Sequence, residues 1–278
     1  MKIAISAEST IDCPKALLEE YGIKTVPFTV ILDDKEALDG EITPAEIFQF
    51  VKEKNILPKT SAVNKFQFET HFSELLKDND AVIHFSLSSD MSSAYQNAKE
   101  VADKCSNIFV VDSRSLSTGI ALLAIKASEL AKEGKTADEI YETCMALRDK
   151  VSASFILDKL NYLYKGGRCN SLAYFGASLF SIKPQIVVDG GKMRVGKKFV
   201  GKFDKLIGKY CQETLSKAPA YDTSHAFVTY TTATEEAVNT AKESLEKAGF
   251  KNIHITNAGG TISSHCGPNT LGILFITA

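Results

Sequence analysis

Four stretches of the chain gather hydroxyl, basic and imidazole side chains among small residues, where loops leave predicted strands or helices. They are Lys59-Thr60-Ser61, Leu87–Ser93, Lys165–Arg168 and Gly259–Pro268. Serine and threonine hydroxyls donate hydrogen bonds, and backbone N–H groups at the start of a helix attract negative charge. In an open α/β sheet, ligands bind beyond the carboxyl ends of the strands. These residue types therefore predict a binding site for an anionic group.

Each stretch also has a purely structural interpretation. Serine is a preferred N-cap residue, Thr60-Ser61 suits a turn, and Lys165–Arg168 suits the end of a helix. Four serines between Ser88 and Ser93 exceed what a single cap needs. His265 lies among glycines and serines, which offer no apolar face for it to fill. The serine segment and His265 are therefore the stronger candidates.

Several other chemistries find no support in the sequence. Gly191 to Lys197 has the spacing of a phosphate-binding loop, but Lys198 stands where a serine or threonine is needed. The sequence contains no GxGxxG after its first strand, no GxSxG and no HExxH. Its six cysteines form no CxxC pair and no metal-ligand spacing with histidine. We therefore expect free thiols, no metal and no cofactor.

The composition is that of a globular protein and gives no sign of a nucleic-acid-binding or membrane protein. The chain has 278 residues, of which 44 % are hydrophobic and 24 % are charged, as in ordinary globular proteins. A formal net charge of −2 gives no general attraction to nucleic acid or to anionic membranes. We find no signal peptide and no membrane-spanning segment, and expect a cytoplasmic protein with no nucleic-acid partner and no stable membrane insertion.

In the first half of the chain, predicted strands alternate with the helices that must position these residues. This alternation is typical of a parallel sheet covered by helices. The predicted strands are Lys2–Ser6, Lys24–Leu32 (with Pro27 suggesting a sheet edge), Ala81–Leu87 and Asn107–Asp112. The predicted helices are Pro14–Tyr21, Pro44–Lys52, Lys65–Lys77, Ala94–Lys104, Gly119–Glu133 and a capped helix from Thr136 to about Lys150.

The pattern changes near Val151, where strands become more frequent. Gly190-Gly191 predicts a hairpin turn between two short strands. The predicted strands are Ser152–Leu157, Gln185–Asp189, Lys192–Val195, Ala226–Tyr230, Asn252–Thr256 and Ile273–Thr277, and the predicted helices are Ser171–Phe180, Phe203–Ser216 and the one ending at Gly249. We therefore predict an α/β fold with two domains, residues 1–150 and 151–278.

Taken in order, the four stretches resemble the DegV family of bacterial fatty-acid-binding proteins. The family's Thr-Ser turn matches Thr60-Ser61, and its Ser-Ser-x-Leu-Ser-Gly-Thr-Tyr segment matches Ser88–Tyr95. The other matches are Val111-Asp112-Ser113, Lys165–Arg168, Ile182-Lys183-Pro184, His265–Pro268 and Leu271-Gly272. The chain departs from the family pattern at Ala7-Glu8-Ser9, at Ser93-Ala94, at Tyr230-Thr231-Thr232 and at Val200-Gly201.

The resemblance implies an N-terminal parallel sheet in α/β/α layers and a C-terminal α/β domain with a mixed sheet. It implies a long-chain fatty acid between the two domains, with residues near 60–78 packing on the second. Its carboxylate would be held by Thr60 and Ser92, with Ser61, Ser93 and His265 beside them. Phe28, Leu172, Phe175 and Leu179 are candidate walls of an acyl tunnel, although ordinary core packing also explains the apolar run from Leu172 to Phe180.

The resemblance further implies a carrier without catalytic residues of its own. Some members present the fatty acid to a separate ATP-dependent kinase that makes an acyl phosphate for phospholipid synthesis. Arg168 and His265 would then support phosphoryl transfer or kinase docking. Two alternatives remain open: an enzyme for a small carbonyl substrate, related to dihydroxyacetone kinase, and a lipid-responsive regulatory protein.

Overall fold

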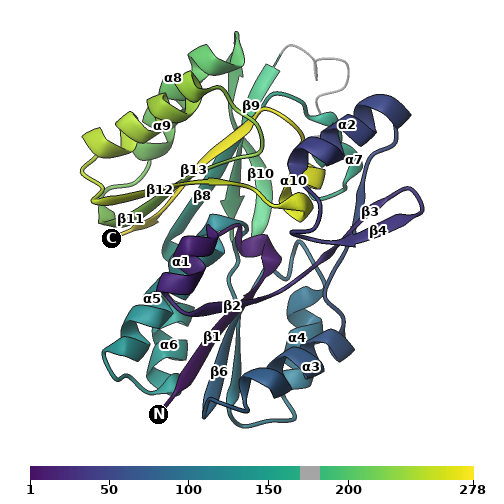
Figure 1. Cartoon of the computed structure of the whole chain (residues 1–278). Coiled ribbons are helices and arrows are strands. Elements are labelled where there is room, and N and C mark those ends of the chain that lie inside the picture. Colours follow the sequence, from purple (N-terminus) through teal and green to yellow (C-terminus); the bar gives the residue numbers. More distant parts are fainter. Residues whose placement is uncertain (170–181) are drawn as a thin grey trace.

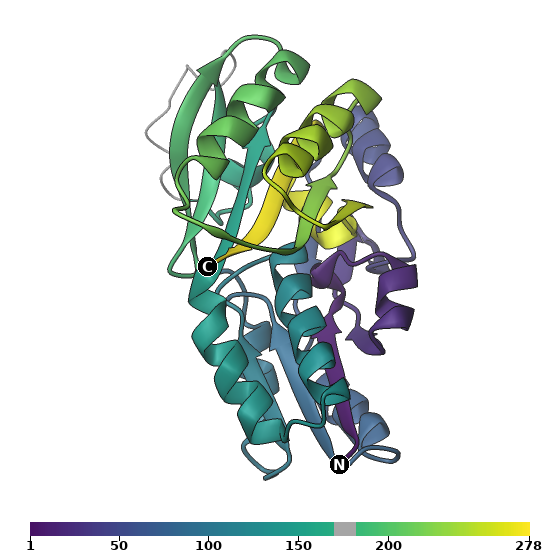
Figure 2. The ribbon, with the colours of Figure 1, turned by 90° about the vertical axis from the view of Figure 1, so that its left-hand side faces the viewer.

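The computed structural model describes residues 1–169 and 182–278, which form two α/β lobes stacked along the long axis of the molecule (Figures 1 and 2). The first lobe is built on a four-stranded sheet and the second on a six-stranded sheet. A third, three-stranded sheet lies beside the junction of the lobes. The predicted helix Ser171–Phe180 lies outside the described residues.

The first sheet is entirely parallel, in the order β2-β1-β6-β7. Helices cover both of its faces, as Figure 1 shows, and every residue of β6 is buried, as expected for a strand between two helical layers. Its strands are β1 (Ile3–Glu8), β2 (Ile23–Val26), β6 (Ala81–Ser86) and β7 (Ile108–Asp112). The helices are α1 (Lys15–Glu20), α3 (Lys65–Leu75), α4 (Ala94–Ala102), α5 (Thr118–Lys132) and α6 (Ala137–Leu147), and the short 3-10 turns are Ser9–Ile11 and Arg148–Lys150.

The second sheet is mixed, in the order β10-β9-β8-β13-β11-β12, with only β11 and β12 parallel. Helices α8 (Phe203–Leu215) and α9 (Glu235–Lys247) pack on one face, and α5 of the first lobe contacts the other. The strands are β8 (Val151–Leu157), β9 (Ile182–Asp189), β10 (Lys192–Val200), β11 (Tyr221–Tyr230), β12 (Asn252–Asn257) and β13 (Thr270–Thr277). The predicted α/β fold with a parallel and a mixed sheet is confirmed.

The small third sheet has the order β4-β3-β5, formed by β3 (Thr29–Leu32), β4 (Lys35–Leu38) and β5 (Lys59–Ser61). It packs with α10 (Gly260–Cys266), which also contacts α2 (Pro44–Lys54) and α7 (Asn161–Lys165). Segments that are distant in the sequence therefore meet here. Thr60 and Ser61 lie beside α10 in this group, whereas α3 packs against α4 and β2 of the first lobe.

The prediction of one strand over Lys24–Leu32 was wrong. The segment divides at Pro27 into β2, in the first sheet, and β3, in the small sheet. Proline has no N–H to donate to a ladder, so the chain changes sheets at this residue. The predicted hairpin at Gly190-Gly191 is confirmed, because both glycines have positive φ angles, +56° and +86°, as a type I′ turn requires.

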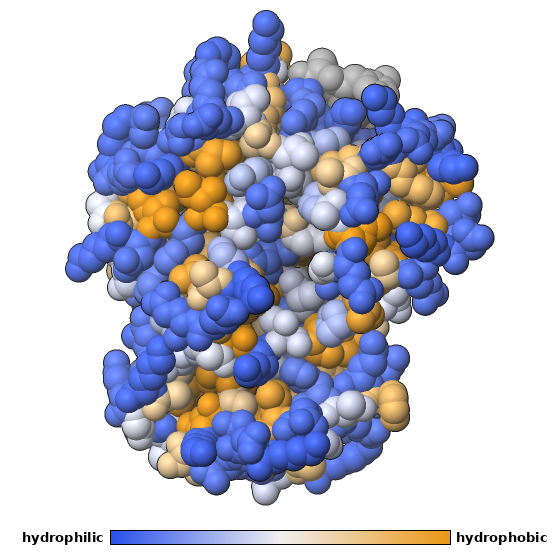
Figure 3. Space-filling view, in the orientation of Figure 1, coloured by the Kyte–Doolittle hydropathy of each residue, from blue (hydrophilic) through white to orange (hydrophobic). Residues whose placement is uncertain are grey.

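The face shown in Figure 3 is mostly hydrophilic, with apolar residues in separate patches. Pale, weakly polar residues gather near the centre of this face, between the two lobes (Figure 3). Among the helices of the described residues, none has the length and apolar character that crossing a bilayer requires.

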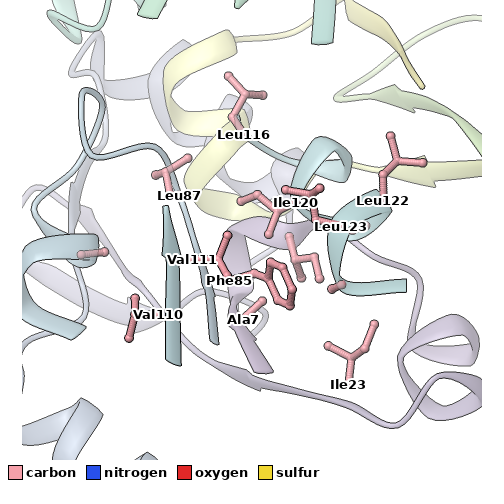
Figure 4. Close-up of a cluster of buried hydrophobic side chains, with 14 of the residues drawn as sticks. Ala7, Ile23, Phe85, Leu87, Val110, Val111, Leu116, Ile120, Leu122 and Leu123 are labelled. Atoms are coloured by element: carbon pink, nitrogen blue, oxygen red, sulfur yellow. The ribbon is translucent and has the colours of Figure 1, made fainter. Parts of the chain in front are cut away.

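The main hydrophobic core continues from the first lobe into the second. Figure 4 shows its centre, where Ala7, Phe85 and Val111 of the first sheet meet Ile120 and Leu123 of α5. The same cluster includes side chains of the second sheet, among them Phe155 of β8 and Leu274 of β13. Helix α5 is hence buried along most of its length between the two sheets, and the lobes share one core at their junction.

Candidate ligand-binding site

A cavity of about 250 Å³ lies at the junction, bounded by α10, β5 and the loop that follows β6. Its wall contains the residues that the resemblance implies for carboxylate binding, which are Thr60, Ser61, Ser92, Ser93 and His265. Arg168, which the resemblance implies for phosphoryl transfer or kinase docking, lines it as well. Phe28, a candidate tunnel residue, also lines it, whereas Leu172, Phe175 and Leu179 lie outside the described residues. Five other lining residues belong to two of the predicted stretches, namely Leu87, Met91, Thr261, Ile262 and Cys266. The remaining three, Ala62, Leu116 and Met193, were not predicted from the sequence.

Thr60 and His265 form the central polar contact of this cavity. Thr60 Oγ1 lies 2.8 Å from His265 Nε2, although the two residues are 205 positions apart in the sequence. Strand β5 places Thr60 by pairing it with Val30, and α10 carries His265. At the end of α7, Gly166 makes room for the imidazole, because a Cβ on this residue would lie 2.7 Å from Nδ1 of His265.

His265 is neutral near pH 7. Burial lowers the pKa of its imidazole to about 4, and the positive charge of Arg168 acts in the same direction. A neutral imidazole has one donor nitrogen and one acceptor nitrogen. In the tautomer with the proton on Nε2, it donates to Thr60 Oγ1 and leaves the threonine hydroxyl free to donate to a ligand.

The four serines of the loop between β6 and α4 make different contacts. Ser88 Oγ donates to the carbonyl of Gly191 at 2.7 Å, and Ser89 Oγ donates to Asp112 Oδ2 at 2.6 Å. Ser92 Oγ accepts from the N–H of Ala94 at 3.1 Å, so its own proton remains free. Ser93 is exposed at the N-cap position and makes no side-chain capping bond. Capping therefore accounts for only part of this segment, and Ser92 can also donate to a ligand.

Basic residues surround the outer side of the cavity. Arg168 is exposed and lines the main cavity together with two outer ones of about 440 and 470 Å³. Lys59 and Lys165 line the first outer cavity, and Lys192 and Arg194 line the second. Two of these cations have acidic partners, since Lys192 lies 3.4 Å from Asp90 and Arg194 lies 3.3 Å from Asp189. An anion at the cavity would meet positive charge at its outer side.

The inner side of the cavity is apolar. A second cavity of about 30 Å³ shares Leu116, Ile262 and Cys266 with the main one and extends to Phe155 and Leu274. Burial raises the pKa of the Cys266 thiol to about 12, so this side chain remains a neutral, weakly polar wall. The arrangement suits a molecule with an anionic end near Thr60 and an apolar body.

Helix α10 is held by two buried aspartates from the first 40 residues. The N–H groups of Gly259 and Gly260 donate at 2.7 Å to Asp12 Oδ1 and Asp39 Oδ1. Ser117 Oγ contacts Asp12 Oδ2 at 2.5 Å. Burial raises the pKa of Asp12 to about 8, while the bonds from Ser117 and Gly259 oppose this rise. Neither aspartate was predicted from the sequence, because nothing in the neighbouring residues indicates a contact with a segment more than 200 positions away.

A buried polar chain supports the serine loop from the other side. Glu8, fully buried, accepts from the N–H of Leu87 at 2.9 Å and from Ser86 Oγ at 2.6 Å, with His84 Nε2 at 3.3 Å. Ser6 Oγ lies 3.0 Å from His84 Nδ1. His84 is thus a structural residue of the strand.

The described residues give no sign of metal or disulfide chemistry. Within residues 1–169 and 182–278, no three His, Cys, Asp or Glu side chains gather as a metal site would require. None of the six cysteines forms a disulfide bond within the described residues, and four of them are buried.

Comparison with known proteins gives one consistent result. A family model described as "Uncharacterised protein, DegV family" matches residues 2–278. A DegV domain-containing protein of Caldanaerobacter subterraneus is 32 % identical, covering 99 % of this chain and 98 % of its own. The Bacillus subtilis protein DegV is 29 % identical, covering 98 % of each chain.

Solved structures agree with the sequence relatives. One, described as showing fatty acid binding of a DegV family protein from Thermus thermophilus, has a TM-score of 0.92 at 27 % identity and covers all of both chains. Another, DegV of Bacillus subtilis, described as a fatty acid binding protein, has a TM-score of 0.85 at 27 % identity over both full chains.

Proposed function

The chain belongs to the DegV family, and from this premise we propose that it binds one long-chain fatty acid in the cavity between its lobes. The carboxylate lies against Thr60 and Ser92, with Ser61, Ser93 and His265 beside them. The hydrocarbon chain extends inward past Phe28. The protein acts as a carrier of the fatty acid and performs no reaction by itself.

One observation carries this proposal: hydroxyl groups and apolar walls share a single cavity. The Ser92 hydroxyl is available as a donor on the outer side, and so is the Thr60 hydroxyl when His265 carries its proton on Nε2. The inner side continues into an apolar cavity. Hydroxyl donors hold a carboxylate without neutralising it, and each methylene removed from water contributes about 0.8 kcal/mol before the costs of ordering. A fatty acid is the ordinary metabolite that has both parts.

We further propose that the bound carboxylate is presented to a separate ATP-dependent kinase for acyl-phosphate formation. The carboxylate held by neutral donors keeps a nucleophilic oxygen. Phosphoryl transfer depends on positioning and on balancing of charge, which the exposed guanidinium of Arg168 at the outer side of the cavity can supply. The basic side chains of Lys59 and Lys165 add to this positive field.

The first experiment is denaturing extraction of the protein as purified, followed by mass spectrometry of the lipid fraction. We expect close to one long-chain fatty acid per chain. A protein that is empty and also takes up no added palmitate would contradict lipid binding and favour the small-carbonyl enzyme. Lipid binding without stimulation of any fatty-acid kinase would contradict presentation and favour a lipid-responsive regulator.

A further inference from the structure

The first outer cavity, of about 440 Å³, carries positive charge that no acidic residue balances. Lys59, Lys165 and Arg168 line it, and the described lining residues include no aspartate or glutamate. Arg168 donates one N–H to the carbonyl of Gly166, but no ion pair within residues 1–169 and 182–278 involves any of the three cations. Unpaired cations around one cavity repel one another, so an anion bound among them is stabilised.

The second outer cavity, of about 470 Å³, has acidic residues that balance its cations. Lys192 lies 3.4 Å from Asp90, which lines the same cavity, and Arg194 lies 3.3 Å from Asp189. Cations that already have acidic partners contribute less to binding a further anion. Of the two outer cavities, the first is therefore the better site for an anion.

Tyr162 adds a hydrogen-bond donor to the first outer cavity. The residue lines this cavity and is only 5 % exposed. Its hydroxyl makes no hydrogen bond to the described residues, and it is not one of the unpaired polar atoms that are closed off from solvent. Burial raises the pKa of the phenol, so the group keeps its proton and can donate. A buried tyrosine usually finds a partner for its hydroxyl, and here the cavity is the place for one.

The ring of Tyr162 is fixed by packing. It meets the ring of Phe48 edge to face, with 6.1 Å between the centroids. Gly267 allows a close approach on another side, because a Cβ on this residue would lie 2.6 Å from the Tyr162 ring. The hydroxyl is therefore held in place before a ligand arrives, which lowers the entropic cost of binding.

The first outer cavity adjoins the place proposed for the carboxylate. Thr60, Arg168 and His265 line both this cavity and the main one. A group attached to a carboxyl carbon at Thr60 can therefore extend outward toward Lys165 and Tyr162, while the acyl chain stays in the main cavity.

We propose that the first outer cavity binds the phosphoryl group of an acyl phosphate, with Tyr162 donating to a phosphoryl oxygen and Lys59, Lys165 and Arg168 balancing the charge. This inference rests on the proposed function. A phosphoryl group carries about two negative charges near pH 7 and offers several acceptor oxygens, so it suits this set of cations and a hydroxyl donor better than a carboxylate does. The protein consequently binds an acyl phosphate more tightly than the fatty acid from which it is made.

The test uses the phosphonate analogue of palmitoyl phosphate, in which a methylene group replaces the bridging oxygen. Its dissociation constant from delipidated protein is compared with that of palmitate. We expect the native protein to bind the phosphonate about tenfold to a hundredfold more tightly, the affinity equivalent of a hydrogen bond to a charged group. Tyr162→Phe, which removes only the hydroxyl, should weaken the phosphonate by about tenfold and leave palmitate unchanged.

Charge variants separate the two outer cavities. Lys165→Ala should weaken the phosphonate severalfold more than it weakens palmitate, because it removes a cation of the first outer cavity. Lys192→Ala, in the second outer cavity, is the matched control and should change neither affinity. Inorganic phosphate added to the palmitate-loaded protein distinguishes an attached phosphoryl group from a separate one. Phosphate that binds as tightly as the phosphonate would overturn the assignment to an acyl phosphate.

A melting temperature separates ligand recognition from a structural role. Because the Tyr162 hydroxyl has no partner among the described residues, Tyr162→Phe should leave the melting temperature of the ligand-free protein unchanged. A native protein that binds both lipids equally, or a folded Tyr162→Phe protein that keeps the full preference, would overturn the inference. If palmitate fails to bind the native protein, the proposed function fails and the inference with it. If palmitate binds and only the preference is missing, the proposed fatty-acid binding stands.

Discussion

At the scale of single residues, the hydroxyl protons that remain free after folding determine what the cavity can hold. The hydroxyls of Ser88 and Ser89 donate hydrogen bonds to the Gly191 carbonyl and to Asp112. The hydroxyl of Ser92 only accepts a hydrogen bond, from the N–H of Ala94. Thr60 faces an imidazole that burial keeps neutral. Two neighbouring residues of the same type, Ser89 and Ser92, therefore have different functions in the proposed complex.

Ser92→Ala should weaken fatty-acid binding by about tenfold to a hundredfold, the usual effect of removing one hydrogen bond to a charged group. The dissociation constant for palmitate measures this effect. Ser92→Thr keeps the hydroxyl and should bind nearly as well, while Ser73→Ala, an exposed serine on α3, is the matched control. Unchanged affinity in a folded Ser92→Ala protein would contradict the assignment.

Arg168→Ala should retain bound fatty acid and keep its stability, because the side chain is exposed. The same variant should lower acyl-phosphate formation with an ATP-dependent fatty-acid kinase by tenfold or more, since charge balance at the phosphoryl group is lost. Arg168→Lys is the control that keeps the charge. Normal turnover by the alanine variant would show that Arg168 has neither the docking nor the transfer role.

At the scale of elements, the site depends on short segments that other parts of the chain hold in place. Helix α10 has seven residues and begins with glycine, so its own sequence favours a helix only weakly. Asp12 and Asp39 hold its first turn, and the end of α7 packs beside His265. The turn between β9 and β10 crosses to the first lobe, where the Gly191 carbonyl accepts from Ser88.

Gly191→Ala should disturb this crossing more than Gly190→Ala does. Both glycines have positive φ angles, and alanine there costs roughly 1 kcal/mol of folding free energy. A Cβ on Gly191 would also lie 2.9 Å from Ser88 Oγ, whereas one on Gly190 has nothing within 4 Å. Urea unfolding should show a larger loss for Gly191→Ala, and palmitate affinity should fall in this variant alone. An equal loss of palmitate affinity in the two variants would show that the contact between Gly191 and Ser88 has no role in binding.

At the scale of the whole molecule, buried titratable groups connect stability to pH. Burial lowers the pKa values of His71, His254 and His265 to about 4. His254 contacts His225 at 3.0 Å, and His225 lies 3.3 Å from Glu129 of α5, so this group joins the second sheet to the first lobe. Protonation of His254 therefore acts on the junction, and protonation of His265 acts on the cavity.

We expect the free energy of unfolding to fall, by on the order of a few kcal/mol, between about pH 6.5 and pH 4. In that range the unfolded histidines bind protons that the folded ones exclude, so acid favours unfolding. Asp12 opposes this trend, because its folded pKa of about 8 lies above its unfolded value of 3.8. His254→Gln should reduce the slope measured by urea unfolding across this range, and an unchanged slope would contradict the role of His254.

The sequence predicted the alternation of strands and helices well, because apolar periodicity and capping are local signals. It also brought Thr60, Ser92 and His265 together, but only through their order in a family pattern. It missed α10, since glycines and serines favour loops unless distant groups such as Asp12 hold them. Pro27 was recognised, yet the change of sheet at this residue depends on contacts with Ser61 and Leu38 that no local pattern records.

The position of β13 within the second sheet has a consequence for how the protein is made. This strand lies between β8 and β11 and pairs with both, yet the ribosome synthesises it after every other strand of the sheet. The parallel sheet of the first lobe can assemble while translation continues. By contrast, the edges of β8 and β11 that pair with β13 stay unpaired until β13 has been synthesised. During that interval the nascent chain exposes two strand edges to other chains, so this half of the molecule has the greater need for a chaperone.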